Sequence, residues 1–367
     1  MTEQELSAYI QAIRPADEAA MEAARRRQAE LAKPPGSLGQ LEEISIRLAG
    51  VTGQVCPAMG KCRVAVFAAD NGVVAEGVSC TPPAVTMQQA VNMTFRKTGM
   101  SAMAAAFGDD VSVVDVGIDG DVPPVGVLDR KVRRGTGDIA REDAMTPQQV
   151  LDAMAAGMEQ AARARADGVT ALGIGEMGIG NTTTSAAVLA ALTGADIEAV
   201  TGRGGGLTDE GFLRKKEVLR QALALHRPDG NDVIGVLAGV GGLDLAAMTG
   251  AFLGCAHERV PAAVDGFISI AAALCAVRLC PAVRDVLFLS HDSYEVGYRI
   301  AAETLGLQPC LRLGMRLGEG SGCPLLFRVL EGACGVMRGM ATFGEASIED
   351  SYLDEIRAVD AFTVEAT

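Results

Sequence analysis

The chain has 367 residues, of which 49% are hydrophobic, and a formal net charge of −14. This composition allows a large buried core, and the sequence contains no stretch of about 18 uncharged apolar residues that could cross a membrane. The negative charge argues against nucleic acid as a partner, because phosphate backbones attract clustered lysine and arginine.

The sequence shows no targeting signal and no metal-binding spacing. Residues 1–5 lack the basic and apolar segments of a signal peptide, so we expect a cytoplasmic protein with no membrane partner. The nine cysteines have no CxxC spacing and most lie in apolar runs, as reduced thiols do. His226, His257 and His291 lie too far apart for a zinc motif. We expect neither a metal nor a cofactor.

The expected elements change in type along the chain. Residues 18–32 and 38–49 have helical spacing. Further on, short β-branched runs predict strands, and segments of helical period lie between them. The predicted strands are 63–67, 111–116, 170–173, 233–237, 262–264 and 285–289. The predicted helices among them are 147–166, 185–192, 209–225, 243–256 and 267–279, and a last helix covers 324–340.

This alternation of strands and helices predicts parallel pairing with both sheet faces covered. We expect an α/β fold, a three-layer Rossmann-like parallel sheet of about six strands. Both ends of the chain lack strand signals. They are therefore expected to form a smaller helical domain, residues 1–55 and 324–367, beside an α/β domain of residues 56–323.

A glycine-rich segment, residues 173–184 (GIGEMGIGNTTT), joins a predicted strand to a predicted helix. Glycines at such a turn let backbone N–H groups converge on an anion, and the helix N-terminus adds positive potential. We expect a phosphate cradle, with a purely structural turn as the alternative. Gly173, Gly175 and Gly178 also match G-x-G-x-x-G, so a nicotinamide-dependent oxidoreductase is considered. Asp196 lies at roughly the spacing of a ribose contact, but its surroundings are typical of a helix end.

A second glycine-rich segment, residues 316–322 (RLGEGSG), holds a single carboxylate, Glu319. An acid with little bulk around it can be approached by a substrate and partly dehydrated, which makes it a candidate general base. The alternative is a capping loop, because an acid near a helix N-terminus is favourable in any case. Loops that follow parallel strands meet at one sheet edge, so we expect the polar loops of this chain to converge on one crevice.

Several motifs, in order along nearly the whole chain, together resemble the nicotinate-nucleotide:dimethylbenzimidazole phosphoribosyltransferase family. They are residues 33–39, 68–73, 76–79, 175–183, 202–204, 241–244, 264–267 and 316–322. The resemblance implies that the phosphoribosyl group of nicotinate mononucleotide is transferred to an aromatic base. The products would be nicotinate and an α-ribotide 5′-phosphate for the nucleotide loop of cobamides. It also implies a homodimer, or a heterodimer with a paralogous chain, whose crevices the neighbour completes.

The resemblance also implies residue roles. Glu319 would accept the proton of the incoming base, and Glu176 would be a second carboxylate near the reaction centre. Two close acids raise at least one pKa by repulsion. The phosphate and nucleotide site is expected at Gly178, Gly180, Asn181, Thr182, Thr183, Gly204, Lys215, Asp265, Ser293 and Gly318. The lower-ligand base is expected at Ser79, Cys80, Gln88, Met177 and Leu317. Asp244 and Asp265 match family positions, with helix capping as the alternative role.

The departures from the family pattern concern the base pocket. Asn71 stands where histidine is common, Thr81 lies near a common aromatic position, and residues 290–297 differ from the usual Ser-x-Glu-Pro-Gly. The acceptor therefore stays open among benzimidazoles, purines and phenols. A regulatory paralogue or non-catalytic partner subunit is the other alternative. Since such a protein could lose Glu319, and this chain retains both Glu319 and Glu176, an enzyme is favoured.

Overall fold

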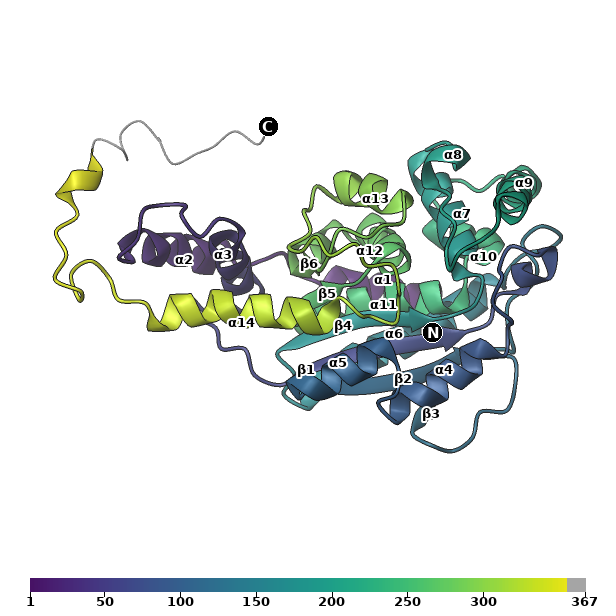
Figure 1. Ribbon diagram of the computed structural model, residues 1–367, viewed down its shortest axis with the longest axis horizontal. Coiled ribbons are helices and arrows are strands. Elements are labelled where there is room, and N and C mark those ends of the chain that lie inside the picture. The colour runs from purple at the N-terminus through teal and green to yellow at the C-terminus, as the bar shows by residue number, and fades with distance from the viewer. Residues whose placement is uncertain (355–367) are drawn as a thin grey trace.

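A six-stranded parallel sheet forms the centre of the computed structural model, which describes residues 1–354 (Figure 1). Its strands are β1 (Cys62–Ala69), β2 (Asp110–Gly117), β3 (Val127–Asp129), β4 (Ala171–Met177), β5 (Ala262–Val264) and β6 (Leu287–Leu289). The sheet order is β3-β2-β1-β4-β5-β6, and every neighbouring pair is parallel. Strands β2 and β3 lie on one side of β1, and β4, β5 and β6 lie on the other, so the order of the strands changes direction between β1 and β4. In open α/β sheets, ligands bind outside the carboxyl ends of the strands at such a point.

Helices cover both faces of this sheet, as the fold class requires. They are α1 (Glu3–Ala12), α2 (Glu18–Glu30), α3 (Gln40–Thr52), α4 (Val85–Thr94), α5 (Gly99–Phe107), α6 (Pro147–Ala166), α7 (Asn181–Thr193), α8 (Ile197–Val200), α9 (Asp209–His226), α10 (Val233–Val240), α11 (Leu243–Glu258), α12 (Phe267–Leu279), α13 (Gly297–Leu305) and α14 (Cys323–Gly339). Short 3-10 helices lie at Gly72–Glu76, Pro281–Val286 and Ser351–Leu353. Helix α11 packs on one face with α6 against it, whereas α4, α5 and α14 pack on the other (Figure 1).

The core explains the near-continuous apolar runs of the sequence. Apart from Arg63, every residue of β1 is buried. Helix α11 is buried on all sides from Leu243 to Ala256. A strand or helix that is apolar all round must lie between two layers, which is the position of both elements.

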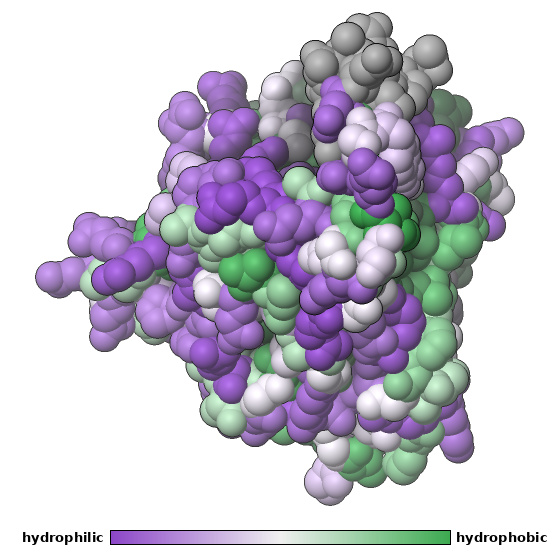
Figure 2. Space-filling view, turned by 90° about the vertical axis from the view of Figure 1, so that its left-hand side faces the viewer, coloured by the Kyte–Doolittle hydropathy of each residue, from purple (hydrophilic) through white to green (hydrophobic). Residues whose placement is uncertain are grey.

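Helices α2, α3 and α14 enclose a second, smaller apolar cluster at one end of the molecule. It consists of Ala20, Ala24, Leu31, Ile46, Ala49 and Met337. Helix α1, by contrast, packs on α11, and Leu6 and Ile13 belong to the large core. The division into residues 1–55 with 324–367 and residues 56–323 stays a prediction, and its last residues, 355–367, lie outside the described part. The surface at this end is mostly hydrophilic with small hydrophobic patches (Figure 2).

The observed elements confirm the α/β class and correct one strand. Residues 233–237, predicted as a strand, begin α10, and the Asp232 side chain caps that helix by accepting a hydrogen bond from the Gly235 N–H. A short apolar run does not distinguish a buried strand from a buried helix by period alone. The sixth strand is instead β3, which the sequence pattern did not indicate. Among residues 1–354, no helix has the length and apolar character needed to span a bilayer.

Candidate active site

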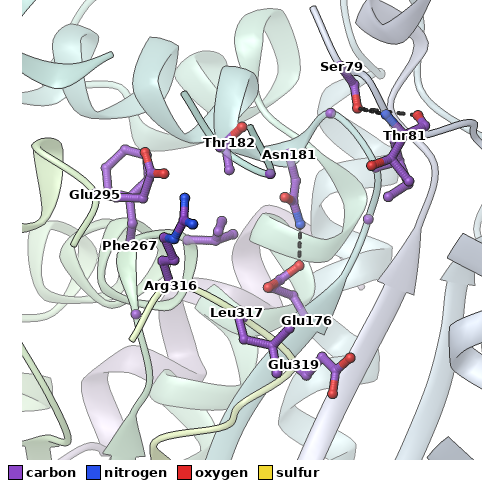
Figure 3. Close-up of a pocket in the computed structure, with 18 of the residues that line it drawn as sticks. Ser79, Thr81, Glu176, Asn181, Thr182, Phe267, Glu295, Arg316, Leu317 and Glu319 are labelled. Carbon is purple, nitrogen blue, oxygen red and sulfur yellow. Dashed lines mark hydrogen bonds between the residues drawn. The ribbon is translucent and has the colours of Figure 1, made fainter. Parts of the chain in front are cut away.

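A cavity of about 240 Å³ lies at the carboxyl ends of β4, β5 and β6. Its walls come from the loops that follow these strands, from the segment after β1, and from two glycine-rich loops, 203–207 and 316–319. The polar loops after β4, β5 and β6 therefore converge as expected, whereas residues 69–72 after β1 and 117–119 after β2 do not line the cavity. Figure 3 shows Glu176 and Glu319 on one side, with Asn181 and Thr182 above them. Most of the predicted residues line this cavity: Ser79, Cys80, Glu176, Met177, Gly178, Gly180, Asn181, Thr182, Gly204, Asp265, Ser293, Leu317, Gly318 and Glu319.

Three predicted residues do not line the cavity. Gln88 is exposed on α4, and its neighbour Gln89 lines the cavity instead. Thr183 is buried in the first turn of α7. Lys215 is buried behind Thr182, which it contacts. The Gln88 difference reflects helical geometry, because adjacent residues of a helix point about 100° apart, and sequence alone did not fix which one faces the ligand.

Glu319 adopts a backbone conformation that is rare for a residue with a side chain. Its φ is 63°, between Gly318 at 85° and Gly320 at 81°. Left-handed backbone persists at a non-glycine residue only where surrounding contacts hold it, and such sites are often functional. Here the contact is at the carboxylate, whose Oε2 accepts a hydrogen bond of 3.1 Å from the Met100 N–H in the first turn of α5.

Asp265 holds the loop on the other side of Glu319. Its two carboxylate oxygens accept hydrogen bonds from the Gly320 N–H at 3.1 Å and the Gly322 N–H at 2.7 Å. Burial raises the pKa of Asp265, while the nearby His291 acts in the opposite direction. The expected nucleotide role of Asp265 stays a prediction; its observed contacts orient the loop that carries Glu319.

The glycines of the 173–178 pattern serve close packing within β4. Gly173 and Gly175 lie inside the strand rather than in the turn after it. A Cβ atom on Gly175 would lie 2.5 Å from the Gly320 backbone nitrogen, and one on Gly173 would lie 2.5 Å from the Cys323 Cβ. In a dinucleotide fold these glycines form the turn into the helix. The structure therefore removes the sequence argument for an oxidoreductase.

Glu176 is buried beside this loop, at the carboxyl end of β4. Burial, followed by the negative charge of Asp244, raises its pKa to about 8, whereas a hydrogen bond from the Asn181 side chain opposes the shift. The expectation that repulsion tunes an acid here needs correction in two respects. Desolvation is the larger cause, and the main acidic neighbour is Asp244 rather than Glu319.

Behind the opposite end of the cavity lies a buried lysine, close to a left-handed glycine in the cavity wall. The Lys215 ammonium donates to the Thr182 Oγ1 at 2.8 Å and to the Gly202 carbonyl at 3.1 Å. Burial lowers its pKa to about 8, and the Glu295 carboxylate opposes this effect. Gly204 adopts a left-handed backbone, with φ of 55°. This corner can bind an anion through a charge and several donors.

Asn181 does not offer its side-chain donors to this corner. Its Nδ2 donates to Glu176 Oε2 and, at 2.9 Å, to Asp244 Oδ2. Because an amide nitrogen carries two N–H bonds, none is left for a phosphate.

Other lining residues were not expected from the sequence. They include Val78, Arg203, Phe267 and Arg316, whereas Thr81, His291 and Glu295, which also line the cavity, belong to the segments that depart from the family pattern in the base pocket. Arg203 and Arg316 lie in motifs quoted above, and a cation within a glycine-rich loop is a signal that could have identified them. Within residues 1–354, no group of three or more His, Cys, Asp and Glu side chains has an arrangement that could hold a metal ion.

The chain is similar to known proteins over most of its length. The family model described as Phosphoribosyltransferase (DBI_PRT) matches residues 13–348. The nicotinate-nucleotide–dimethylbenzimidazole phosphoribosyltransferase of Clostridium perfringens strain 13 is 46% identical over 341 residues, 93% of this chain and 94% of that protein. The enzyme of the same name from Geobacter metallireducens is 45% identical over 347 residues, 94% of this chain and 98% of that protein.

A solved structure supports the same relationship. The crystal structure of CobT from Thermus thermophilus is 44% identical, has a TM-score of 0.88, and covers 91% of this chain and 100% of its own. The left-handed Glu319, the buried Glu176 and the cationic corner thus occur in a chain that matches these proteins over almost its whole length. The chain belongs to the DBI_PRT family of phosphoribosyltransferases.

Proposed function

We propose that this protein transfers the phosphoribosyl group of nicotinate mononucleotide to an aromatic nitrogen base, which gives an α-ribotide 5′-phosphate and nicotinate. The names of the relatives state the two reactants for those proteins. The observation that carries the proposal here is the buried Glu319 carboxylate, fixed in a strained backbone at the cavity wall. It supplies a proton acceptor where the incoming base would lose its proton.

The reaction balances with one base and no leaving-group acid. A ring nitrogen of the acceptor attacks C1′ as the C1′–N bond to nicotinate breaks, and the bonding electrons return to the pyridinium nitrogen. The pyridinium is already cationic in the substrate, so it leaves as neutral pyridine without protonation. The second ring nitrogen of the acceptor gives its proton to Glu319. Positioning of the two substrates supplies much of the remaining rate.

The two ends of the cavity suit the two substrates. Lys215, Thr182 and Gly204 suit the 5′-phosphate, because a charged donor and convergent hydrogen-bond donors favour it. Met177 and Leu317, which follow Glu176 and precede Gly318 in the chain, line the cavity and suit the flat face of the acceptor; Ser79 lines it beside Thr81 (Figure 3). Dimethylbenzimidazole is the first acceptor to test, and purines and phenols stay alternatives.

The assay uses the purified full-length chain with nicotinate mononucleotide and, in parallel, dimethylbenzimidazole, adenine and a simple phenol. Nicotinate release and ribotide mass are followed by liquid chromatography and mass spectrometry. We expect ribotide with dimethylbenzimidazole. Absence of nicotinate release with every acceptor would contradict the proposed reaction.

A dimer is also proposed. Tyr294 and Leu317, on loops at the cavity, are 72% and 57% exposed, and Leu313 nearby is 55% exposed. Large apolar side chains that are exposed in the same region of the surface favour a contact with another protein chain. Sedimentation of a fully active monomer would contradict a dimer that completes the site. The cytoplasmic location stays a prediction.

A further inference from the structure

A buried amide links two carboxylates behind the wall of the active site. Asn181, the first residue of α7, donates through Nδ2 to Glu176 Oε2 on β4 and to Asp244 Oδ2 on α11. All three side chains are buried. Because both N–H bonds of the amide are used, its orientation is determined only while both acceptors are present. The close-up in Figure 3 shows the Asn181 side chain pointing at Glu176.

Asp244 has partners at both of its carboxylate oxygens. Its second oxygen, Oδ1, accepts a hydrogen bond of 3.0 Å from the Leu245 N–H at the start of α11. A Cβ atom on Gly178 would lie 2.7 Å from Oδ2, and one on Gly242 would lie 2.5 Å from Oδ1. The carboxylate therefore fits closely between two backbone segments. It does not line the cavity, so it reaches the substrate only through another residue.

Glu176, which accepts a hydrogen bond from Asn181, contacts the loop that carries Glu319. A Cβ atom on Gly318 would lie 2.5 Å from Glu176 Oε1, so the Glu176 carboxylate lies directly against the loop that carries Glu319. A continuous series of contacts thus runs from Asp244 through Asn181 and Glu176 to Gly318, the residue before Glu319. Asp265 supports the same loop from its other side.

We propose that Asp244 is a positioning residue: it fixes the Asn181 amide in the orientation that donates to Glu176, and so holds Glu176 against the loop of Glu319. The inference rests on the proposed transfer reaction and adds to it a residue that touches neither substrate. A helix-capping role alone is the competing explanation, since Asp244 lies in the first turn of α11 and binds the Leu245 N–H, which has no partner within the helix. The two explanations differ in whether the effect of Asp244 depends on Asn181.

Exchanging the two side chains separates these explanations. In Asp244→Asn, the new side chain cannot accept from both Leu245 and Asn181, so one amide N–H faces another. In Asn181→Asp, three carboxylates crowd together. In the double variant D244N/N181D, an amide at position 244 accepts from the Leu245 N–H and donates to the acid at position 181. That acid can in turn accept a hydrogen bond from the protonated carboxyl of Glu176. The exchange restores the series of contacts with the amide and the acid in reversed order.

The experiment measures kcat and KM for nicotinate mononucleotide in the wild type, both single variants and the exchange. We expect each single variant to lose on the order of tenfold or more in kcat, with KM within about twofold, because misplacement of a catalytic group affects the chemical step. The exchange should recover most of that loss, as coupled neighbours do. Asp232→Asn, which changes another acid at a helix N-terminus outside the cavity, is the control and should retain wild-type kcat.

The outcomes are separable. Wild-type kcat in Asp244→Asn, or additive losses in the double variant, would overturn the proposal in favour of simple capping. Loss of folded structure in both single variants, measured by circular dichroism, would assign the cluster to stability and overturn it as well. A wild type that releases no nicotinate would instead contradict the proposed reaction, before any variant is compared.

Discussion

Replacing Glu319 by glutamine removes its ability to accept a proton and little else. The amide oxygen can still accept the Met100 N–H that Oε2 now binds at 3.1 Å, and the side chain keeps its size in a site where it is 5% exposed. Glutamate and glutamine both carry a Cβ atom, so the substitution adds no strain to the left-handed backbone, whose φ is 63°. The loop should therefore keep its position.

The size of the effect follows from the role assigned to Glu319. Loss of a positioned general base costs about 10²–10⁴-fold in rate. We therefore expect kcat of Glu319→Gln to fall by that factor with dimethylbenzimidazole, while the dissociation constant for nicotinate mononucleotide stays within about threefold. The phosphate and ribose contacts lie on other residues.

The assay combines nicotinate release with calorimetric titration of nicotinate mononucleotide, on the same protein preparations. Glu303→Gln, an exposed acid on α13, is the matched control and should behave as the wild type. A Glu319→Gln variant with kcat within a factor of about three of the wild type would refute general-base catalysis by this residue. Equal losses in binding and turnover would instead indicate that the loop had moved.

Three further changes are predicted. Burial raises the pKa of Glu176 to about 8, whereas the unfolded chain loses this proton near pH 4.5. Between these pH values the native state holds a proton that the unfolded state has lost, so this group makes the free energy of unfolding fall as pH rises. Glu176→Gln should flatten that decline in chemical denaturation at several pH values, and an unchanged slope would contradict the assignment. Thr182→Ala and Lys215→Met should weaken nicotinate mononucleotide by about 1.5–3 kcal/mol through lost charge-assisted hydrogen bonds, and should weaken the riboside without phosphate much less. Equal losses for both ligands, measured by calorimetry, would place the phosphate elsewhere. Gly175→Ala should lower both stability, by about 1–3 kcal/mol, and activity, because its Cβ would meet the Gly320 backbone at 2.5 Å. Gly332→Ala in α14, where a Cβ meets nothing within 4 Å, is the control and should gain about 0.5–1 kcal/mol in thermal or denaturant unfolding.

Local sequence signals predicted the elements that are decided locally. Helix α6 has its predicted bounds because Thr146 and Gln149 form a capping box and Pro147 occupies the first turn. Helix α12 also matches its prediction, since its apolar run is long enough to exclude a strand. The run at 233–237 was too short for that distinction, and β3, with three residues, carried too little pattern to be recognised.

The site was predictable as a set of residues but not as a set of contacts. A glycine-rich loop with a single acid indicated Glu319, because unusual composition is visible in one sequence, whereas Glu176 was expected from the resemblance to the family. The Met100 N–H that binds Glu319 is 219 positions away, and the Asp244 carboxylate that shares the Asn181 amide is 63 positions from it. Nothing local in either segment indicates these pairs. They result from which strand ends lie next to each other in the sheet.

Both the apolar cluster of α2 and α3 and the position of Glu319 depend on α14 and the loop before it, which are synthesised late. Met337 of α14 completes the apolar cluster that α2 and α3 begin, and the loop just before this helix carries Glu319 to the start of α5. A ribosome therefore releases α2 and α3 long before the segment that covers their apolar faces exists. Until then the apolar faces of α2 and α3 pack only against each other, and partly folded chains with such incompletely covered apolar surface are prone to aggregation. Catalytic competence and the burial of the first helices are both completed by a segment made after every strand of the sheet, so activity reports that α14 has packed in its place.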